Sequence, residues 1–397
     1  MRKSTIIFAA LSLLVASMEA QESDCKHWSI DAESFAGGII PHSKDVKKAL
    51  QSKYSGIYAI GFGYQTLPSD SSIFASDYDY PLFGLRFSIT DFSHVKLKEG
   101  SRLGNIYTLY GRMERSLLRT HRCLFDYLLD AGLAYATSPH DWLTNPSNPF
   151  IGSRLIVYVG FGLGVSYKVS SNVEMGINTG FRHYSSGRLG MPNSGINLFG
   201  AFLSGRYYFD ARPQFFHKLP KPEFAKEWNF HIYAGNGWQT SLQEWRMDLK
   251  ANNETCRSHY KLRPKFFLST DAMYRYTHKF STGLGMDLFY TGHTGLLRQW
   301  DSVLYSEQDM ESRKYSKLAV GIAVNQEIYY NNFSINVSFG YYLFRQVGIH
   351  DEERFYQRAG FRHYFPKLNN MFMGIAIKAH RFSQAEYLEL SVGIKFV

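Results

Sequence analysis

The chain has 397 residues and a formal net charge of +10, and its 44 basic residues are scattered rather than gathered into runs. A nucleic-acid-binding protein is therefore not expected, and anionic lipid head groups are the acidic partner that this charge favours. Hydrophobic residues make up 45% of the chain and aromatic residues 16%. Beyond the N-terminus, however, no apolar run reaches the roughly 18 residues that a membrane-spanning helix needs.

The first 20 residues have the three-part form of a secretory signal peptide. A basic start at Arg2 is followed by the apolar residues 6–16, and the small residue Ala20 precedes a polar segment. We therefore expect an exported protein whose mature chain begins near Gln21.

The three cysteines, Cys25, Cys123 and Cys256, are an odd number at wide spacings. They fit neither a disulfide framework nor the paired spacing of a zinc site. We predict no metal site and no cofactor.

Residues 154–168 carry the clearest strand pattern. Large apolar side chains occupy the odd positions from Leu155 to Tyr167, while the even positions from Gly160 to Ser166 are glycine or serine. An apolar outer face and a small inner face are typical of transmembrane β-barrel strands. The glycines also resemble part of a phosphate-binding loop, but no helix follows them, so a nucleotide site is not expected.

Similar runs recur along the chain and predict an all-β fold, a transmembrane antiparallel outer-membrane β-barrel of about 14–16 strands. Besides 154–168, the runs lie near residues 28–41, 54–65, 80–93, 105–116, 126–138, 173–184, 196–210, 229–240, 263–276, 280–292, 315–330, 333–347, 354–364, 370–382 and 386–397. Two eight-stranded barrels in tandem are the alternative fold.

The connections between these runs predict how the barrel is oriented. Short turns lie at 169–172, 277–279, 331–332 and 366–370, and long polar loops lie at 139–153, 241–262 and 293–314. Outer-membrane barrels place the short turns in the periplasm and the long loops outside.

We expect four segments along the chain. Residues 1–20 form the signal peptide, 21–210 a first barrel half, 211–228 a proline-containing connection, and 229–397 a second barrel half.

The most informative segment runs from Gly180 to Asn197, because it places a His two residues before a Ser at the end of a predicted strand. Side chains two apart in a strand share one face. His183 and Ser185 fall in parity with the apolar Ile177 and Phe181, so we expect them on the lipid-facing side at the extracellular end. Asn197 falls in parity with apolar residues of the next strand and is expected to join them.

A Ser nucleophile needs a base within hydrogen-bonding reach and a third group that orients the base. His183, Ser185 and Asn197 supply residues of these types. We expect amides of the turn at Ser186, or Asn193, to stabilise an oxyanion.

These residues resemble the lipid A 3-O-deacylase (PagL-like) acyloxyacyl hydrolase family, and the larger size resembles its longer Bacteroidetes-type members. Carried over, His183 matches the family's general base, Ser185 its nucleophile and Asn193 the Asn of its loop. Two positions depart from the pattern: Asn197 stands where the family has a Glu, and Ser186 stands where an Asn follows the nucleophile. The resemblance is strongest over residues 28–210.

The resemblance implies an outer-membrane enzyme with its active site on the outside of an eight-stranded barrel. The implied partners are lipid A or lipopolysaccharide of the outer leaflet and membrane lipid. Arg188 in the loop after the motif is expected to suit the lipid A phosphates. The alternative function is a non-enzymatic barrel, either a porin-like channel or a surface structural protein.

Two further features stand apart from this motif. His380 and Glu386 form a possible second polar cluster, with Glu386 on the lipid-facing side by parity and Glu389 on the other side. The five residues 180–184 recur as 360–364, which indicates either a duplication or two interfacial strands of similar composition. Histidines in loops are interpreted as interfacial residues: His42, His140, His293 and His350.

Overall fold

The computed structural model describes residues 28–211, 216, 218–221, 223–250, 260–350 and 353–396. The expected signal peptide, Cys25, Cys256 and part of the connection at 211–228 lie outside the described residues.

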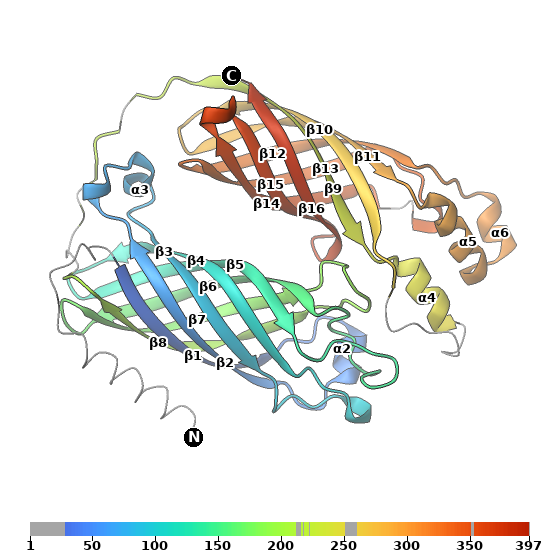
Figure 1. Cartoon of the computed structure of the whole chain (residues 1–397), viewed down its shortest axis with the longest axis horizontal. Coiled ribbons are helices and arrows are strands. Elements are labelled where there is room, and N and C mark those ends of the chain that lie inside the picture. The colour runs from blue at the N-terminus through green and yellow to red at the C-terminus, as the bar shows by residue number, and fades with distance from the viewer. Residues whose placement is uncertain are drawn as a thin grey trace.

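Sixteen antiparallel strands form two closed barrels of eight strands each (Figure 1). The first barrel consists of β1 (Trp28–Ile39), β2 (Tyr54–Gln65), β3 (Leu82–Asp91), β4 (Asn105–Arg119), β5 (Cys123–Ala136), β6 (Leu155–Lys168), β7 (Val173–Ser185) and β8 (Ile196–Tyr208). The second consists of β9 (Glu227–Gln239), β10 (Arg263–Arg275), β11 (Phe280–Thr291), β12 (Leu318–Tyr330), β13 (Phe333–Phe344), β14 (Phe355–Phe365), β15 (Met371–His380) and β16 (Gln384–Phe396).

The two-barrel alternative is therefore confirmed, and a single barrel of about 14–16 strands is wrong. The eighth strand pairs back with the first, from Ile39 opposite Leu198 to Ser29 opposite Tyr208. β16 closes on β9 in the same way. Closure satisfies every strand edge, so neither barrel has an open edge to which further strands could be added.

Each barrel contains an even number of strands, so its chain enters and leaves at the same end. The two barrels therefore have the same orientation, with their short turns at one end and their long connections at the other (Figure 1). The inner end carries the predicted short turns, including 169–172 and 331–332. The outer end carries the long connections, with α2 (Lys44–Ala49), α4 (Leu242–Lys250), α5 (Thr294–Leu304) and α6 (Glu307–Glu311). The predicted loops 241–262 and 293–314 thus contain helices that the polar composition did not indicate.

The remaining short elements lie in connections. They are α3 (Ile73–Asp77), which lies at the inner end, and the 3-10 turns η1 (Pro68–Asp70), η2 (Lys98–Gly100), η3 (Gly348–His350) and η4 (Pro366–Leu368).

Apolar side chains cover the outside of both barrels. In β7 the outward residues Met175 and Phe181 are exposed, whereas the inward residues Asn178 and Arg182 are buried. The second barrel exposes apolar side chains in the same alternating way, for example in β11. Among the described residues, no helix is long and apolar enough to cross a membrane.

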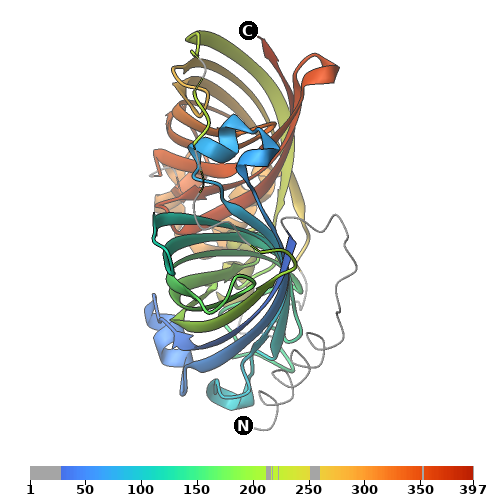
Figure 2. The same ribbon diagram turned by 90° about the vertical axis from the view of Figure 1, so that its left-hand side faces the viewer.

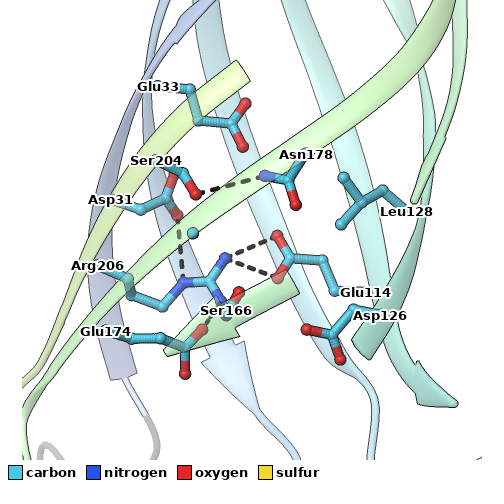
Figure 3. Close-up of a pocket in the computed structure, with 11 residues that line it drawn as sticks. Asp31, Glu33, Glu114, Asp126, Leu128, Ser166, Glu174, Asn178, Ser204 and Arg206 are labelled. Carbon is cyan, nitrogen blue, oxygen red and sulfur yellow. Dashed lines mark hydrogen bonds and ion pairs between the residues drawn. The ribbon is translucent and has the colours of Figure 1, made fainter. Parts of the chain in front are cut away.

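Charged side chains fill the lumen of the first barrel (Figure 3). Arg86 lies 2.9 Å from Asp31, 2.8 Å from Glu33 and 2.7 Å from Glu114. A cavity of about 10 Å³ lies among these acids and Arg206, which is room for about one water molecule. The buried charges of Arg86, Asp31, Glu33 and Glu114 are tolerated because they are paired with opposite charges.

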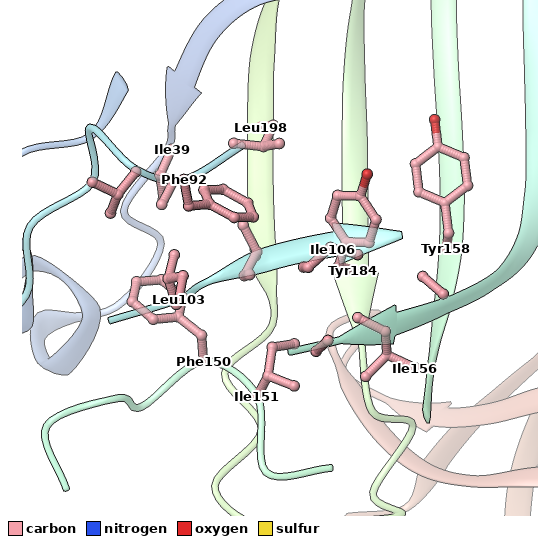
Figure 4. Close-up of a cluster of buried hydrophobic side chains, with 14 of the residues drawn as sticks. Ile39, Phe92, Leu103, Ile106, Phe150, Ile151, Ile156, Tyr158, Tyr184 and Leu198 are labelled. Atoms are coloured by element: carbon pink, nitrogen blue, oxygen red, sulfur yellow. The ribbon is translucent and has the colours of Figure 1, made fainter. Parts of the chain in front are cut away.

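An apolar cluster closes the lumen at the outer end, beneath the strand ends that carry the predicted site (Figure 4). Tyr184 is 0% exposed and shares a 2.8 Å hydrogen bond with Thr90. Ile196 and Leu198 are buried in the same cluster. Since these residues alternate with His183, Ser185 and Asn197, the packed interior fixes the backbone from which the outward side chains project.

The inner ends of the two barrels are in contact through the connection that contains α3 (Figure 2). The Tyr78 hydroxyl donates to the Tyr329 carbonyl at 3.1 Å, and the rings of Phe74 and Tyr330 lie 6.1 Å apart. The buried carboxylate of Asp77 faces His278 of the second barrel and lies 2.7 Å from Lys221. Burial raises the pKa of Asp77, but the hydrogen bond from Lys221 and the charges of Lys279 and His278 outweigh it and lower the pKa overall.

Substituting Asp77→Asn should loosen this contact, because it removes the charge that the basic partners surround. A lowered pKa means that the carboxylate stabilises the contact above its usual value of 3.8 and loses this effect as the pH falls through the lowered value. Hydrogen exchange of residues 73–80 should report a local opening free energy lower by about 1–3 kcal/mol in the variant at pH 7. Unchanged exchange at pH 7 would show that the ion pairs contribute nothing there.

Candidate active site

The register of β7 and β8 brings the predicted polar residues together at the outer end of the first barrel. His183 lies directly opposite Asn197 in the antiparallel pair. Ser185 is the last residue of β7, on the same outward face as His183. Side chains of directly opposed residues approach closely enough to interact, so the strand pairing itself assembles this pair.

His183 belongs to a chain of three side chains. Its Nδ1 donates to Oδ1 of Asn197 at 2.6 Å, and Nδ2 of Asn197 donates to Nδ1 of His42 at 3.1 Å. An amide oxygen can only accept and an amide nitrogen can only donate. The chain therefore places a proton on Nδ1 of His183 and leaves Nε2 of neutral His183 as a free base.

His42 was interpreted from the sequence as an interfacial loop residue, and this contact was missed. It lies between β1 and α2, 155 positions from Asn197 along the chain. The Ile40 amide donates to the Asn197 carbonyl at 2.8 Å, which fixes this segment beside β8. Only the closure of β1 on β8 brings His42 to Asn197.

The hydroxyl of Ser185 is held within its own loop. It receives hydrogen bonds from the Gly187 amide at 3.2 Å and from Nδ2 of Asn193 at 3.2 Å, and lies 3.3 Å from Oδ1 of Asn193. In the described part of the chain, no hydrogen bond joins Ser185 to His183. Nucleophile–base contacts are often loose without substrate, so a change of the Ser185 rotamer is the step that would bring them together.

Asn193 is placed over the nucleophile by its own side chain. Its Oδ1 accepts from the Ser186 amide at 2.9 Å, which turns Nδ2 toward Ser185. The Ser186 hydroxyl points elsewhere and donates to the Gly190 carbonyl at 3.1 Å. Asn193, rather than Ser186, therefore presents the side-chain donor next to the nucleophile.

The loop 186–195, here called the nucleophile loop, packs backbone to backbone on the loop before β6. The Gly195 amide donates to the Phe150 carbonyl at 2.9 Å. A Cβ at Gly190 would lie 2.2 Å from the Gly152 carbonyl, and one at Gly195 would lie 2.9 Å from the His183 ring. Gly195 also has a φ of +72°, so glycine is required here both by conformation and by space for the imidazole.

Two family models match the chain. The model of lipid A 3-O-deacylase (PagL) matches residues 60–206, and the model of the acyloxyacyl hydrolase C-terminal domain matches residues 226–397. The chain belongs to the PagL family of acyloxyacyl hydrolases. Each model falls mainly on one of the two barrels, and no protein of curated function matches the sequence.

Several solved structures resemble parts of this PagL-family chain. Neisserial surface protein A is 13% identical, covering 46% of this chain and 98% of its own, with a TM-score of 0.31. The outer membrane enzyme PagL is 15% identical, covering 44% and 97%, with a TM-score of 0.29. The Acinetobacter baumannii outer membrane protein Omp33 is 6% identical, covering 93% and 98%, with a TM-score of 0.17.

Family membership and the apolar outer faces of both barrels place the protein in the bacterial outer membrane. The outer end of the first barrel, with His183 and Ser185, then lies on the side of the long loops. The family's lipid A deacylase activity agrees with this location.

The second polar cluster of this PagL-family member lies inside the second barrel. His380 Nε2 bonds Oε2 of Glu386 at 2.9 Å, and Lys378 Nζ lies 2.6 Å from the same oxygen. Lys265 pairs with the other oxygen of Glu386. The prediction of a lipid-facing Glu386 is wrong, because the register between β15 and β16 shifts at this residue and turns its side chain inward. Glu389 is buried inside the barrel, as parity predicted.

The repeated five-residue segment is not the mark of a structural duplication. His183 lies near the outer end of β7, the seventh strand of its barrel, whereas His363 lies near the inner end of β14, the sixth strand. The two strands run in opposite directions, so the interpretation as strands of similar composition holds.

Proposed function

We propose that the protein is an outer-membrane ester hydrolase that removes an ester-linked acyl chain from lipid A, with Ser185 as nucleophile and His183 as general base. The observation that carries this proposal is the hydrogen-bonded chain from His42 through Asn197 to His183. It leaves Nε2 of His183 unprotonated on the lipid-facing surface, two residues from a hydroxyl on the same face.

In the reaction, Nε2 of His183 takes the proton of Ser185 as its Oγ attacks the ester carbonyl. The tetrahedral intermediate collapses, the sugar hydroxyl leaves with the proton from His183, and an acyl-enzyme remains. Water, deprotonated by His183, then releases the fatty acid. Asn197 keeps the imidazole in the required tautomer but supplies no charge for the imidazolium.

Two donors lie beside the nucleophile for the oxyanion. The Gly187 amide and Nδ2 of Asn193 both lie 3.2 Å from Ser185 Oγ. When the hydroxyl turns to His183, both donors are released and can bind the oxygen that gains charge. Such preorganised donors contribute most of their effect in the transition state.

The surface around the site suits a phospholipid-like substrate. Phe199 and Leu203 of β8 are about half exposed on the outer wall and offer a surface for acyl chains. Beside His42, α2 presents Lys44, Lys47 and Lys48, all exposed, which suit phosphate groups.

Arg188 is expected from the sequence to contact these phosphates, and its guanidinium lies within electrostatic range of Glu386 and Glu353 of the second barrel. Its carbonyl accepts hydrogen bonds from Thr240 of that barrel.

The porin-like alternative is not supported by the interior of the first barrel. Paired charges fill its lumen, and the apolar cluster at the outer end lies across it. A channel function also gives no role to the hydrogen-bonded side chains of His42, Asn197 and His183 on the outer face.

The proposal is tested with purified protein in detergent micelles containing lipopolysaccharide. We expect release of free fatty acid together with lipid A lighter by one acyl chain, without added metal. Intact lipid A after prolonged incubation with the folded protein would contradict the proposal.

Replacing His42 tests the third member of the hydrogen-bonded chain. In His42→Ala the Asn197 amide loses its acceptor and can rotate, so we expect the deacylation rate to fall by roughly tenfold. His94, an exposed histidine of another outer loop, supplies the matched control His94→Ala, which should retain full activity. Equal rates for the two variants would remove His42 from the site.

A further inference from the structure

The nucleophile loop of the first barrel reaches the second barrel at its outer end. The Arg188 carbonyl accepts two hydrogen bonds from Thr240, from its amide at 2.7 Å and from its hydroxyl at 3.0 Å. Thr240 directly follows β9 and is buried. A Cβ at Gly187 would lie 3.7 Å from the side chain of Ile377 in β15. The turn that follows the nucleophile is therefore held from outside its own barrel.

The backbone of this turn adopts the left-handed conformation at two consecutive residues. The Leu189 amide donates to the Ser186 carbonyl at 2.9 Å, and the two residues between them have φ values of +56° and +65°. The second of these residues is Arg188, whose Cβ makes the left-handed conformation unfavourable. Such conformations persist where surrounding contacts hold them, and the contact with Thr240 does so here.

The same turn carries a donor to the nucleophile. The Gly187 amide lies 3.2 Å from Ser185 Oγ, and Gly187 immediately precedes Arg188. That amide shares its peptide plane with the Ser186 carbonyl, which accepts the 2.9 Å hydrogen bond from the Leu189 amide, and the Leu189 amide shares its own plane with the Arg188 carbonyl. Fixing the Arg188 carbonyl from the second barrel thus restricts the direction in which the Gly187 amide points.

The side chain of Arg188 is also drawn toward the second barrel. Burial lowers the pKa of Arg188, while the carboxylates of Glu386 and Glu353 attract its charge and act in the opposite direction. Glu386 is itself held by Lys265, Lys378 and His380. The polar cluster inside the second barrel therefore presents a fixed acidic group to this loop.

We propose that the second barrel is a positioning element for the active site of the first, in which Thr240 clamps the Arg188 carbonyl and fixes the Gly187 amide beside Ser185. This inference rests on the proposed hydrolase function and assigns a role to the C-terminal half of the chain. Thr240 and Arg188 act through the turn, and neither touches the reacting atoms.

The test compares Thr240→Val with Thr240→Ser in the full-length protein in micelles. Thr240→Val removes the hydroxyl donor, and we expect kcat to fall by about fivefold to tenfold with KM for lipopolysaccharide unchanged. Thr240→Ser should restore kcat. Thr294→Val is the matched control, because Thr294 is a buried hydroxyl at the same end of the second barrel whose partners lie in that barrel.

Hydrogen exchange of residues 186–190 gives a readout that does not depend on catalysis. We expect exchange in this segment to accelerate in Thr240→Val and not in Thr294→Val. Should Thr240→Val fail to fold, Thr240→Ala carries the same test, since it removes the same hydroxyl donor with a smaller side chain.

The outcomes separate the inference from the function on which it rests. Normal kcat and unchanged exchange in Thr240→Val, or in Thr240→Ala where it replaces that variant, would overturn the positioning role even if the wild type is an active hydrolase. If the wild type has no deacylase activity but exchange accelerates in Thr240→Val, the clamp is supported and the hydrolase function is refuted. An increase in KM with unchanged kcat in Thr240→Val would also overturn the inference, because a clamp on the Gly187 amide acts on the chemical step.

Discussion

Replacing Ser185 by Ala should abolish deacylation, lowering the rate of fatty acid release by roughly 10³-fold or more. The substitution removes the only atom that forms the acyl-enzyme in the proposed reaction, and water has no equivalent position beside His183. The change should leave the fold intact, because Ser185 lies at the outward face of a strand end and is only partly buried. The measurement is the initial rate of fatty acid release from lipopolysaccharide in micelles.

Thr179→Ala is the matched control for this variant. Thr179 carries a hydroxyl on the same outward face of β7 and donates to the Gly200 carbonyl at 3.1 Å. Like Ser185→Ala, the Thr179→Ala variant loses one hydroxyl hydrogen bond, but we expect it to keep its deacylase activity. Comparable residual activity in both variants would mean that Ser185 is not the nucleophile.

The second large effect is expected at Asn197. Asn197→Leu removes the acceptor for Nδ1 of His183 and the donor to His42, so the imidazole loses both its orientation and its tautomer. We expect the rate to fall by roughly 10² to 10⁴-fold, as in triads whose orienting residue is lost. The measurement is kcat for fatty acid release, with KM determined alongside.

Asn197→Asp tests whether the role of residue 197 is to accept the hydrogen bond that orients the His183 imidazole. An aspartate still accepts from Nδ1 of His183 and adds the charge that the family's acid supplies to the imidazolium. We expect Asn197→Asp to be as active as wild type or more active, although it gives up the amide donor to His42. If Leu and Asp at this position gave the same rate, Asn197 would not orient His183.

Strand alternation made much of the fold predictable. The runs near 154–168 and 173–184, for example, correspond to β6 and β7 because a barrel wall forces alternate residues into lipid and lumen. Alternation does not state which strands pair across a long connection. Whether β8 joins β1 or β9 depends on that pairing, so one large barrel and two small ones have the same local pattern.

The candidate site likewise contains residues that strand alternation predicts and residues that only the assembled barrels bring together. Parity placed His183 and Ser185 on the outer face, since their spacing is local to one strand. His42 could not be placed, because its contact with Asn197 exists only after β1 closes on β8. Parity also failed at Glu386, where one unpaired residue shifts the register, so that Glu386 and Tyr387 are both buried, although the alternation predicted for the residues after them holds. The contact between the Arg188 carbonyl and Thr240 could not be predicted either, because it depends on where the second barrel lies.

The most direct test of the proposed activity is the mass of lipid A from cells that express the full-length chain. The account predicts a lipid A population lighter by one ester-linked acyl chain in cells with the wild type. It also predicts an unmodified population in cells with Ser185→Ala present at the same level in the outer membrane. An unmodified spectrum with the wild type, or the same shift with Ser185→Ala, would contradict a lipid A hydrolase that uses this serine.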